Sequence, residues 1–473
     1  MGTTRTATMA QPKIAQRLDR RGKGIQAAPL FLLEAGLCAL IVVAPLPFGS
    51  VGPAGRLVLE LLALTLTTLW MLIALKYEVA LPPRAVSVAL IGLLALATIQ
   101  LLPVGAWAVS VLSPHAAALR NGLDPVPGPT LSLAAGATAS ALRTGAALVG
   151  IVFVTTSVVA ARGATRIALT ALLAATFQGL CGLLVYASGT NRLWSLPNPA
   201  STENATGTFV NRNHFAAFLA ATLPLGLGLV FRVARRAQAR SRAGNGLVAA
   251  LGTEGSRALL LGLAALTGTA GLLLSFSRAG TAIGLAAMAG TAVVLLRGKP
   301  VHRFAVIAIV VAIAALPLAD LGADHLAARY AASGTDLTAA GGRLRVAVDT
   351  LRMIAAFPAF GCGFGTFTWV FPAFSSPEVR LHYTFAHNDL LQLGAEGGLP
   401  ALGFLVLALA ALSKPAFRGL RGTSDPLATG AAFGLGALLF HGLVDFNFHI
   451  PGNAAIAAVL SGVLLGVSWN GRS

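Results

Sequence analysis

Long apolar runs recur along almost the whole sequence, and they limit the possible folds more than any other feature. Roughly twenty consecutive apolar residues suffice to cross a bilayer as a helix. We expect such spans at 30–47, 56–75, 85–103, 141–161, 167–187, 214–231, 258–276, 279–296, 304–321, 389–412, 427–444 and 453–469. The sequence therefore predicts an all-α, polytopic membrane protein with about twelve transmembrane helices and helical loops on the outer side.

The charged residues agree with a membrane protein. Only 11% of the residues are charged, whereas soluble domains carry about 25%. Lys and Arg are enriched in cytoplasmic loops, and a cytoplasmic N-terminus places 23 of the 34 basic residues on that side. The net charge of +18 therefore does not indicate nucleic-acid binding. The cytoplasmic cluster "RVARRAQARSR" is instead expected to contact anionic membrane lipids.

The same assignment divides the chain into three parts. Residues 1–29 form a basic cytoplasmic tail, and because no small-residue cleavage site follows, 30–47 is expected to remain as the first helix. Residues 30–187 are N-terminal membrane helices, and 188–469 hold the remaining helices and outer loops. Three cysteines cannot form a disulfide framework, so Cys362 in an outer loop is expected to stay reduced and packed.

Three long loops fall on the outer side, at about 104–140, 188–213 and 322–388. Loops carry functional residues more often than the elements that hold them. Histidines and arginines gather where these loops meet the next span. The candidate functional residues therefore lie at the outer membrane face.

Two arginines lie at the outer ends of spans, although Lys and Arg are generally enriched on the cytoplasmic side. Arg212 lies beside Asn211, Asn213 and His214, and Asn213 can cap the helix that follows. Arg278 lies in a tight turn, with no acidic residue within twenty positions on either side. An arginine at this depth needs a partner or a ligand from elsewhere. Both are candidates for binding an anion, although Arg212 can also snorkel to the interface.

The segment 341–356 contains a third candidate, Arg343. Helical geometry puts Arg345 and Arg352 on one face with Asp349 between them, so these three can neutralise one another. Arg343 points about 160° away from Arg345. It is the arginine that this helix leaves for an anionic ligand.

His387 heads the tenth expected span, in "TFAHNDLLQLG". Imidazole accepts protons near neutral pH, which suits a general base. The alternative is an interfacial or helix-start histidine. Asn388 or Asp389 can then cap the helix, and the helix dipole favours Asp389 at that position. The residues alone leave both interpretations open.

The last outer turn, "FHGLVDFNFHIPGN", adds His441, Asp445, Asn447 and His449. His441 and Asp445 are four residues apart, which predicts a structural pair on one helical face. A metal site is the alternative. However, the chain contains no D-x-D pair that could clamp a diphosphate-bound metal. We predict no metal and no cofactor.

A cluster of arginines is the expected receptor for a diphosphate, which it binds through charge-assisted, bidentate hydrogen bonds. A diphosphate at the outer membrane interface indicates a lipid-linked substrate. The other polar residues of the cluster are expected to support this site. They are Asn211, Asn213, His214, Asn388, Asp389, His441 and Asp445.

Four segments resemble the O-antigen ligase and O-antigen polymerase superfamily: "GTFVNRNHFAAFLA", "LLLSFSRAGTAIG", "GGRLRVAVDTLRMIAAFPAFGCGFGTF" and "HNDLLQLGAEGGLPALG". The resemblance runs from about Thr206 to Gly452. It implies a metal-independent, inverting glycosyltransferase that moves a glycan from undecaprenyl diphosphate to an acceptor hydroxyl. It also implies that Arg212, Arg278 and Arg343 hold the diphosphate and that His387 is the catalytic base. The family usually has an aromatic residue in the helix segment where this chain reads "RLRVAVDT". This difference is expected to affect the packing of that helix and not the role of its arginine.

The resemblance further implies a multi-pass protein of the bacterial inner membrane, with both termini cytoplasmic and a periplasmic active site below the large loop 322–388. Three acceptors remain open: the lipid A core of lipopolysaccharide, a growing lipid-linked chain in exopolysaccharide biosynthesis, and a protein serine. These correspond to a ligase, a polymerase and a protein O-oligosaccharyltransferase. A membrane transporter is the alternative from another class, but transporters place polar sites at the midplane, and here the charges lie at outer ends.

Overall fold

The computed structural model describes residues 27–121, 128–190, 192–194, 196–198, 204–242, 253–296, 342–377, 379, 381–421 and 425–470. Within these residues the fold is almost entirely helical, apart from a short hairpin of β1 (Arg192–Leu193) and β2 (Leu196–Pro197). In the described part, nine helices are long and apolar enough to cross a membrane, and two shorter apolar helices accompany them. The prediction of an all-α, polytopic membrane protein is confirmed.

The described helices match the expected spans closely. Eleven of the twelve spans correspond to a helix, and the one expected at 304–321 lies outside the described residues. The count of twelve therefore stays a prediction. The matching helices are α2 (Ala27–Val43), α3 (Pro53–Ala74), α4 (Arg84–Leu101), α7 (Ala135–Arg162), α8 (Thr165–Ser188), α9 (Arg212–Arg242), α11 (Thr253–Leu274), α12 (Arg278–Leu295), α17 (Asp389–Leu420), α18 (Pro426–Gly442) and α19 (Pro451–Asn470).

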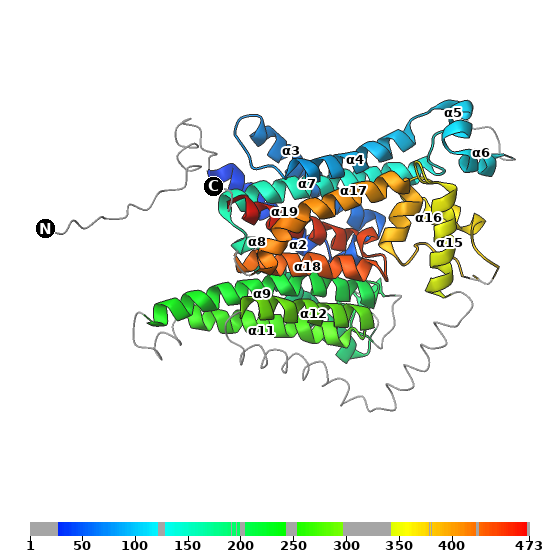
Figure 1. The fold of residues 1–473 in the computed structure, drawn as a ribbon. Helices are drawn as coiled ribbons and strands as arrows, with labels where there is room; N and C mark the ends of the chain where they lie inside the picture. Colours follow the sequence, from blue (N-terminus) through cyan, green and yellow to red (C-terminus); the bar gives the residue numbers. More distant parts are fainter. Residues whose placement is uncertain are drawn as a thin grey trace.

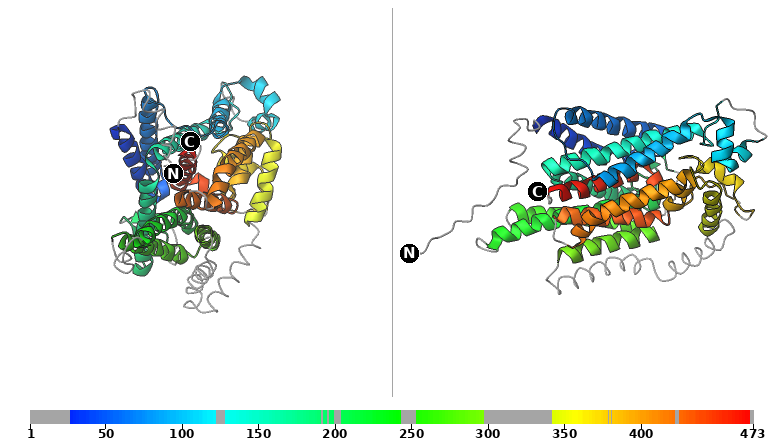
Figure 2. Two further views of the ribbon diagram at one scale, coloured as in Figure 1. Left: turned by 60° about the vertical axis from the view of Figure 1, so that its left-hand side comes forward. Right: turned by 45° about the horizontal axis from the view of Figure 1, so that its top comes forward.

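The long helices run side by side in one bundle, with α18 and α19 between α9 and α7 (Figures 1 and 2). Small residues let the central backbones approach closely, as is common between membrane helices. A Cβ on Gly434 of α18 would lie 2.1 Å from the carbonyl oxygen of Ala221 on α9, and one on Gly430 would lie 2.3 Å from that of Pro224. Larger side chains at these two glycines would push α18 away from α9.

A helical cap covers one end of the bundle, at the right of Figure 1. We call this end the cap end. The helical cap consists of α5 (Gly105–Leu112), α6 (Pro114–Arg120), α15 (Arg343–Ala356), α16 (Phe367–Val370) and η2 (Phe371–Ala373). It has its own apolar core, to which these elements contribute Val109, Ala116, Val346, Met353, Phe367 and Phe371.

Glu396 ties the helical cap to the bundle. Its carboxylate accepts hydrogen bonds from the backbone N–H groups of Gly365 (2.8 Å) and Phe367 (3.1 Å). Two residues further along, Gly398 has a φ of +66°, and α17 is broken there. A side chain strains such left-handed backbone, so glycine suits the position. The segment "EGGLP" is thus both a break in α17 and a packing site for the helical cap.

The cysteines behave as expected. Among the described residues, Cys38, Cys181 and Cys362 are all free thiols. Burial, reinforced by the charge of Glu396, raises the pKa of Cys362 to about 12. A thiol that stays protonated is a poor nucleophile, so Cys362 is a reduced packing residue.

The orientation of the bundle can be tested with two exposed positions at its opposite ends. In a cysteine-free background, we expect Ala373→Cys of η2 to react with a membrane-impermeant maleimide in intact spheroplasts. Gln238→Cys, near the far end of α9, should react only after permeabilisation, because the basic residues around it favour the cytoplasmic side. The readout is labelling of the purified protein. Labelling of position 238 in intact spheroplasts would reverse the orientation.

Candidate active site

Three arginines begin three helices at the cap end. Arg212 is the first residue of α9, Arg278 of α12 and Arg343 of α15. The first turn of a helix has backbone N–H groups without intrahelical partners and carries the positive end of the helix dipole. Basic side chains at such positions are unfavourable unless an anion lies nearby. The three helix starts therefore favour binding of an anion.

The buried carboxylate of Asp445 links the starts of α9 and α12. Asp445 lies in the turn 443–446, which follows α18. Its Oδ2 accepts a 2.8 Å hydrogen bond from Nδ2 of Asn213, next to Arg212. Oδ1 of Asn213 in turn accepts a 2.8 Å hydrogen bond from the hydroxyl of Ser277, next to Arg278. Two of the three arginines thus flank one continuous chain of hydrogen bonds.

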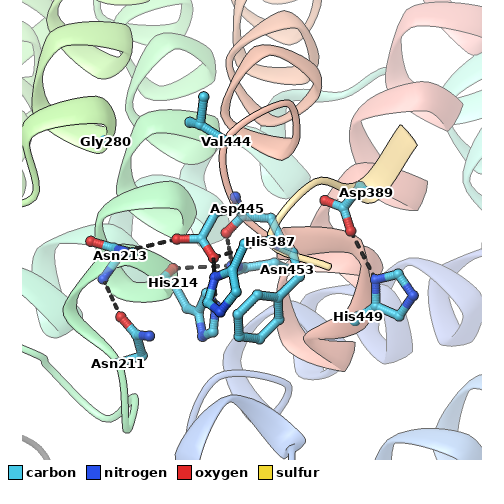
Figure 3. Close-up of polar contacts among 12 residues, drawn as sticks. Asn211, Asn213, His214, Gly280, His387, Asp389, Val444, Asp445, His449 and Asn453 are labelled. Atoms are coloured by element: carbon cyan, nitrogen blue, oxygen red, sulfur yellow. Dashed lines mark hydrogen bonds and ion pairs between the residues drawn. The ribbon is translucent and has the colours of Figure 1, made fainter. Parts of the chain in front are cut away.

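The same turn receives contacts from α15 and α17. Nη1 of Arg343 donates a 3.1 Å hydrogen bond to the carbonyl of Val444. Nδ2 of Asn388 donates a 2.8 Å hydrogen bond to the carbonyl of Leu443. The turn 443–446 is therefore the point at which the starts of α9, α12, α15 and α17 meet, and Figure 3 shows its central residues.

Asp445 faces two histidines as well. Nδ1 of His387 lies 3.6 Å, and Nε2 of His214 lies 3.7 Å, from Oδ1 of Asp445, somewhat beyond hydrogen-bonding distance (Figure 3). Burial alone would raise the pKa of Asp445. The two imidazole groups and the charge of Arg343 outweigh burial and hold that pKa well below its usual range. Asp445 is therefore ionised at neutral pH.

Packing and backbone geometry hold His387 in place. Its ring lies edge-on to Phe446 at 4.8 Å and to Tyr383 at 5.8 Å between centroids, and its side chain is 22% exposed. Its φ is +51°, in the left-handed region that non-glycine residues rarely adopt. Backbone strain of this kind clusters at functional sites. His387 thus has one nitrogen turned to Asp445 and a partly exposed edge.

The helix caps differ in part from those predicted. Asn388 caps α17, since its side chain accepts a hydrogen bond from the N–H of Leu391. The cap of α9 comes from Asn211, whose Oδ1 accepts from the N–H of Asn213 at 2.8 Å. The prediction that Asn213 caps α9 was therefore wrong. It lies inside the first turn, where its side chain is directed to Asp445 instead.

His441 and Asp445 do not form the predicted pair. α18 ends at Gly442, so Asp445 lies beyond the helix and does not share its face with His441. Asp445 contacts Asn213 and faces His214 and His387 instead. His441 is buried against Gly280 of α12, and its Nδ1 makes no hydrogen bond with the described residues.

Asp349 pairs with only one of the two expected arginines. Its carboxylate is fully buried and accepts a 2.7 Å hydrogen bond from Arg352, together with hydrogen bonds from the N–H and hydroxyl of Ser376. Ser376 takes the place that was predicted for Arg345, because the fold of the helical cap brings Ser376 next to Asp349 of α15. Among the described residues, Arg343 pairs with no carboxylate, and its side chain is exposed.

A second histidine–carboxylate cluster lies beside the first. Nδ1 of His449 is 2.8 Å from Oδ1 of Asp389 (Figure 3). Nε2 of His449 is 4.0 Å from Oε2 of Glu396. Burial alone would lower the pKa of His449, but the two carboxylates raise it to about 10. His449 is therefore a cation at neutral pH. It joins the start of α17 to η3 (Asn447–His449).

The raised pKa of His449 predicts how stability depends on pH. A pKa raised from 6.5 to about 10 on folding gives stability that is complete below pH 6.5 and is lost as the pH rises to 10. We expect His449→Gln to lower thermal stability at pH 6, since it removes the cationic partner of a half-buried ion pair with Asp389. The difference in melting temperature between the variant and the wild type should decrease as the pH approaches 10. Thermal unfolding in detergent measures it, with the exposed His382→Gln as control. A gap that stays constant with pH would contradict a cationic His449.

Sequence reasoning missed two residues that organise the site. Ser277 donates to Asn213, and Asn453 of α19 donates from Nδ2 to the backbone carbonyl of His214 at 3.0 Å. Both are small polar residues next to apolar stretches, and this placement was the feature of the sequence that could have identified them. In the described part of the chain, no group of three or more His, Cys, Asp or Glu residues is arranged to hold a metal ion.

Comparison with known proteins agrees with the resemblance seen in the sequence. Residues 263–406 match the model of a family described as O-Antigen ligase. That range includes Arg278, Arg343 and His387. No curated protein matches the chain. Residues 263–406 are thus similar to the O-Antigen ligase family, and the resemblance of the chain to the O-antigen ligase and polymerase superfamily is confirmed.

Proposed function

We propose that the chain is an inverting glycosyltransferase. It moves a glycan from a polyprenyl diphosphate carrier, such as undecaprenyl diphosphate, to an acceptor hydroxyl at the periplasmic face of the bacterial inner membrane. The observation that carries this proposal is the turn 443–446. It brings an exposed arginine, Arg343, and a strained histidine, His387, to adjacent residues, Val444 and Asp445.

The donor diphosphate would be bound by Arg212, Arg278 and Arg343. Each carries a guanidinium, which forms bidentate, charge-assisted hydrogen bonds to phosphate oxygens. The helix starts beneath them add backbone N–H donors. Negative charge grows on the diphosphate as the bond to the sugar breaks. Fixed positive groups at this position would stabilise the transition state without a metal ion.

His387 would act as the general base, and Asp445 would orient it. The carboxylate faces Nδ1 of His387, so it favours the tautomer in which Nδ1 carries the proton and Nε2 has the lone pair. Nε2 then takes the proton of the acceptor hydroxyl. The acceptor oxygen forms a bond to the anomeric carbon as the bond from that carbon to the diphosphate breaks. Displacement from the opposite side inverts the anomeric configuration.

The role of Asp445 gives a prediction of its own. Asp445→Asn keeps an oxygen that can accept from Asn213 but loses the charge that orients His387. We expect kcat to fall about ten- to hundredfold, a part of the about 10²- to 10⁴-fold that general-base catalysis contributes. The dissociation constant for the donor should change little, whereas the melting temperature should fall, because the lowered pKa of Asp445 shows that its charge stabilises the fold. Steady-state kinetics, donor binding and thermal unfolding test this. Full kcat in the Asn variant would remove Asp445 from the mechanism.

A glycan profile of a strain lacking the gene tests the function and separates the acceptors. Loss of polymer from lipid A, with long lipid-linked chains still present, is expected for a ligase. Single repeats without long chains are expected for a polymerase. Loss of glycan from a protein, with both other pools intact, would indicate protein O-oligosaccharyl transfer. An unchanged profile in all three pools would contradict the proposed function.

A further inference from the structure

The segment that follows α4 remains uncharged well past the end of that helix. Residues 85–119 contain no Lys, Arg, Asp or Glu, although α4 ends at Leu101. A segment of average soluble composition has about one charged residue in four. The first charged residue, Arg120, is not directed to water, since its Nη2 donates 2.7 Å to the carbonyl of Ser132 and its Nη1 is buried. α5 and most of α6 thus have a composition unsuited to water.

The exposed face of α5 continues the exposed apolar face of α4. Along α4, the large apolar residues Val88, Ile91 and Ile99 are exposed, as is usual for a helix that faces lipid. Leu102, just past the end of α4, and then Trp107 and Val111 of α5 are exposed as well. Trp107 is the extreme case, with 79% of its surface exposed. Exposed large apolar residues therefore continue along the chain from α4 onto α5.

The opposite face of α5 is packed. Val109 is 2% exposed and belongs to the core of the helical cap, together with Val346 and Met353 of α15. Both faces of α5 are therefore apolar: one packs into the core of the helical cap, and the other is exposed. The connection from Leu101 to Gly105 spans at most about 14 Å. α5 must therefore lie close to the level at which α4 would leave the membrane. Figure 1 shows α5 beside the end of α4.

We propose that α5 is an interfacial helix, which lies in the lipid leaflet at the cap end with Trp107 at the level of the head groups. The amphipathic ring of tryptophan favours the boundary between acyl chains and water. The exposed apolar residues of α5 follow directly on those of α4, a candidate membrane span, along the same uncharged stretch of chain, which favours lipid rather than a second protein as the occupant. Val109 belongs to the same apolar core as Val346 and Met353 of α15, so this anchor also bears on the depth of α15 and of its first residue, Arg343.

Tryptophan quenching tests the proposal without reference to any activity. The chain has five tryptophans, Trp70, Trp107, Trp194, Trp369 and Trp469. A full-length variant that keeps only Trp107, with phenylalanine at the other four, is reconstituted in vesicles containing phospholipids brominated near the head group. We expect these lipids to remove most of the Trp107 emission, while iodide added to the water removes little. The matched control keeps only Trp70, which is buried and hydrogen-bonded to Ser157 and should be quenched by neither.

A nitroxide attached at Val111→Cys gives a second measurement in case the multiple replacements disturb folding. Collision with oxygen should exceed collision with a water-soluble nickel chelate. Strong quenching of Trp107 by iodide, or greater access of the chelate to position 111, would place α5 in water and overturn the proposal. Protection from both quenchers that depends on protein concentration would overturn it too, because a second copy of the chain would then cover this face.

Discussion

His387→Ala is expected to abolish glycan transfer while leaving binding of the lipid-linked donor intact. A positioned general base contributes about 10²- to 10⁴-fold to a rate, so kcat should fall by that factor. The donor should bind normally because the proposed diphosphate ligands lie on α9, α12 and α15, whereas His387 precedes α17. A transfer assay with purified protein, run beside a donor-binding measurement, separates the two quantities.

Two further variants of His387 control for shape and backbone. The left-handed φ of +51° is tolerated best by glycine and asparagine. His387→Asn should therefore fold at least as well as the wild type, and His387→Gln keeps a longer polar side chain. Neither amide can take a proton, so neither should restore transfer. Near-normal turnover in the Ala variant would leave His387 as an interfacial anchor.

Arg343→Ala is expected to weaken donor binding and transfer together. A hydrogen bond to a charged group contributes about 1.5–3 kcal/mol, which corresponds to about a ten- to hundredfold loss of affinity. The matched control is Arg345→Ala, which removes an equally charged and exposed side chain from the same first turn of α15. Because the two side chains point in nearly opposite directions, Arg345→Ala should keep donor affinity.

The comparison depends on the two faces of α15. Arg343 reaches Val444, beside the buried Asp445, whereas the carboxylate of Asp349 is paired with Arg352. Titration of both variants with a polyprenyl diphosphate, with melting temperatures measured in parallel, distinguishes a ligand from a stabilising residue. If Arg345→Ala lost the donor and Arg343→Ala kept it, the assignment of faces would be reversed.

The sequence predicted the spans well because their signal is local. Hydrophobic length alone located eleven of the described helices, and residue type at the helix starts identified Arg212, Arg278, Arg343 and His387 as candidates. The roles of these four residues stay predictions. So does the division of the chain at about residue 188.

The contacts across the fold could not be predicted, because spacing along a chain carries no information about distant partners. Asp445 meets Asn213 across 232 positions, and His449 meets Asp389 across 60. The predicted pair of His441 and Asp445 failed for a local reason. It required α18 to continue past Gly442, although glycine is a common signal for the end of a helix.

Reconstitution of the purified protein with a polyprenyl-diphosphate glycan and a candidate acceptor tests the proposed function most directly. We expect the acceptor to gain the glycan with inverted anomeric configuration and polyprenyl diphosphate to be released in equal amount. Transfer should continue in the presence of a metal chelator. Retention of the donor configuration, a requirement for a divalent cation, or no transfer to any of the three acceptor classes would contradict the proposed mechanism.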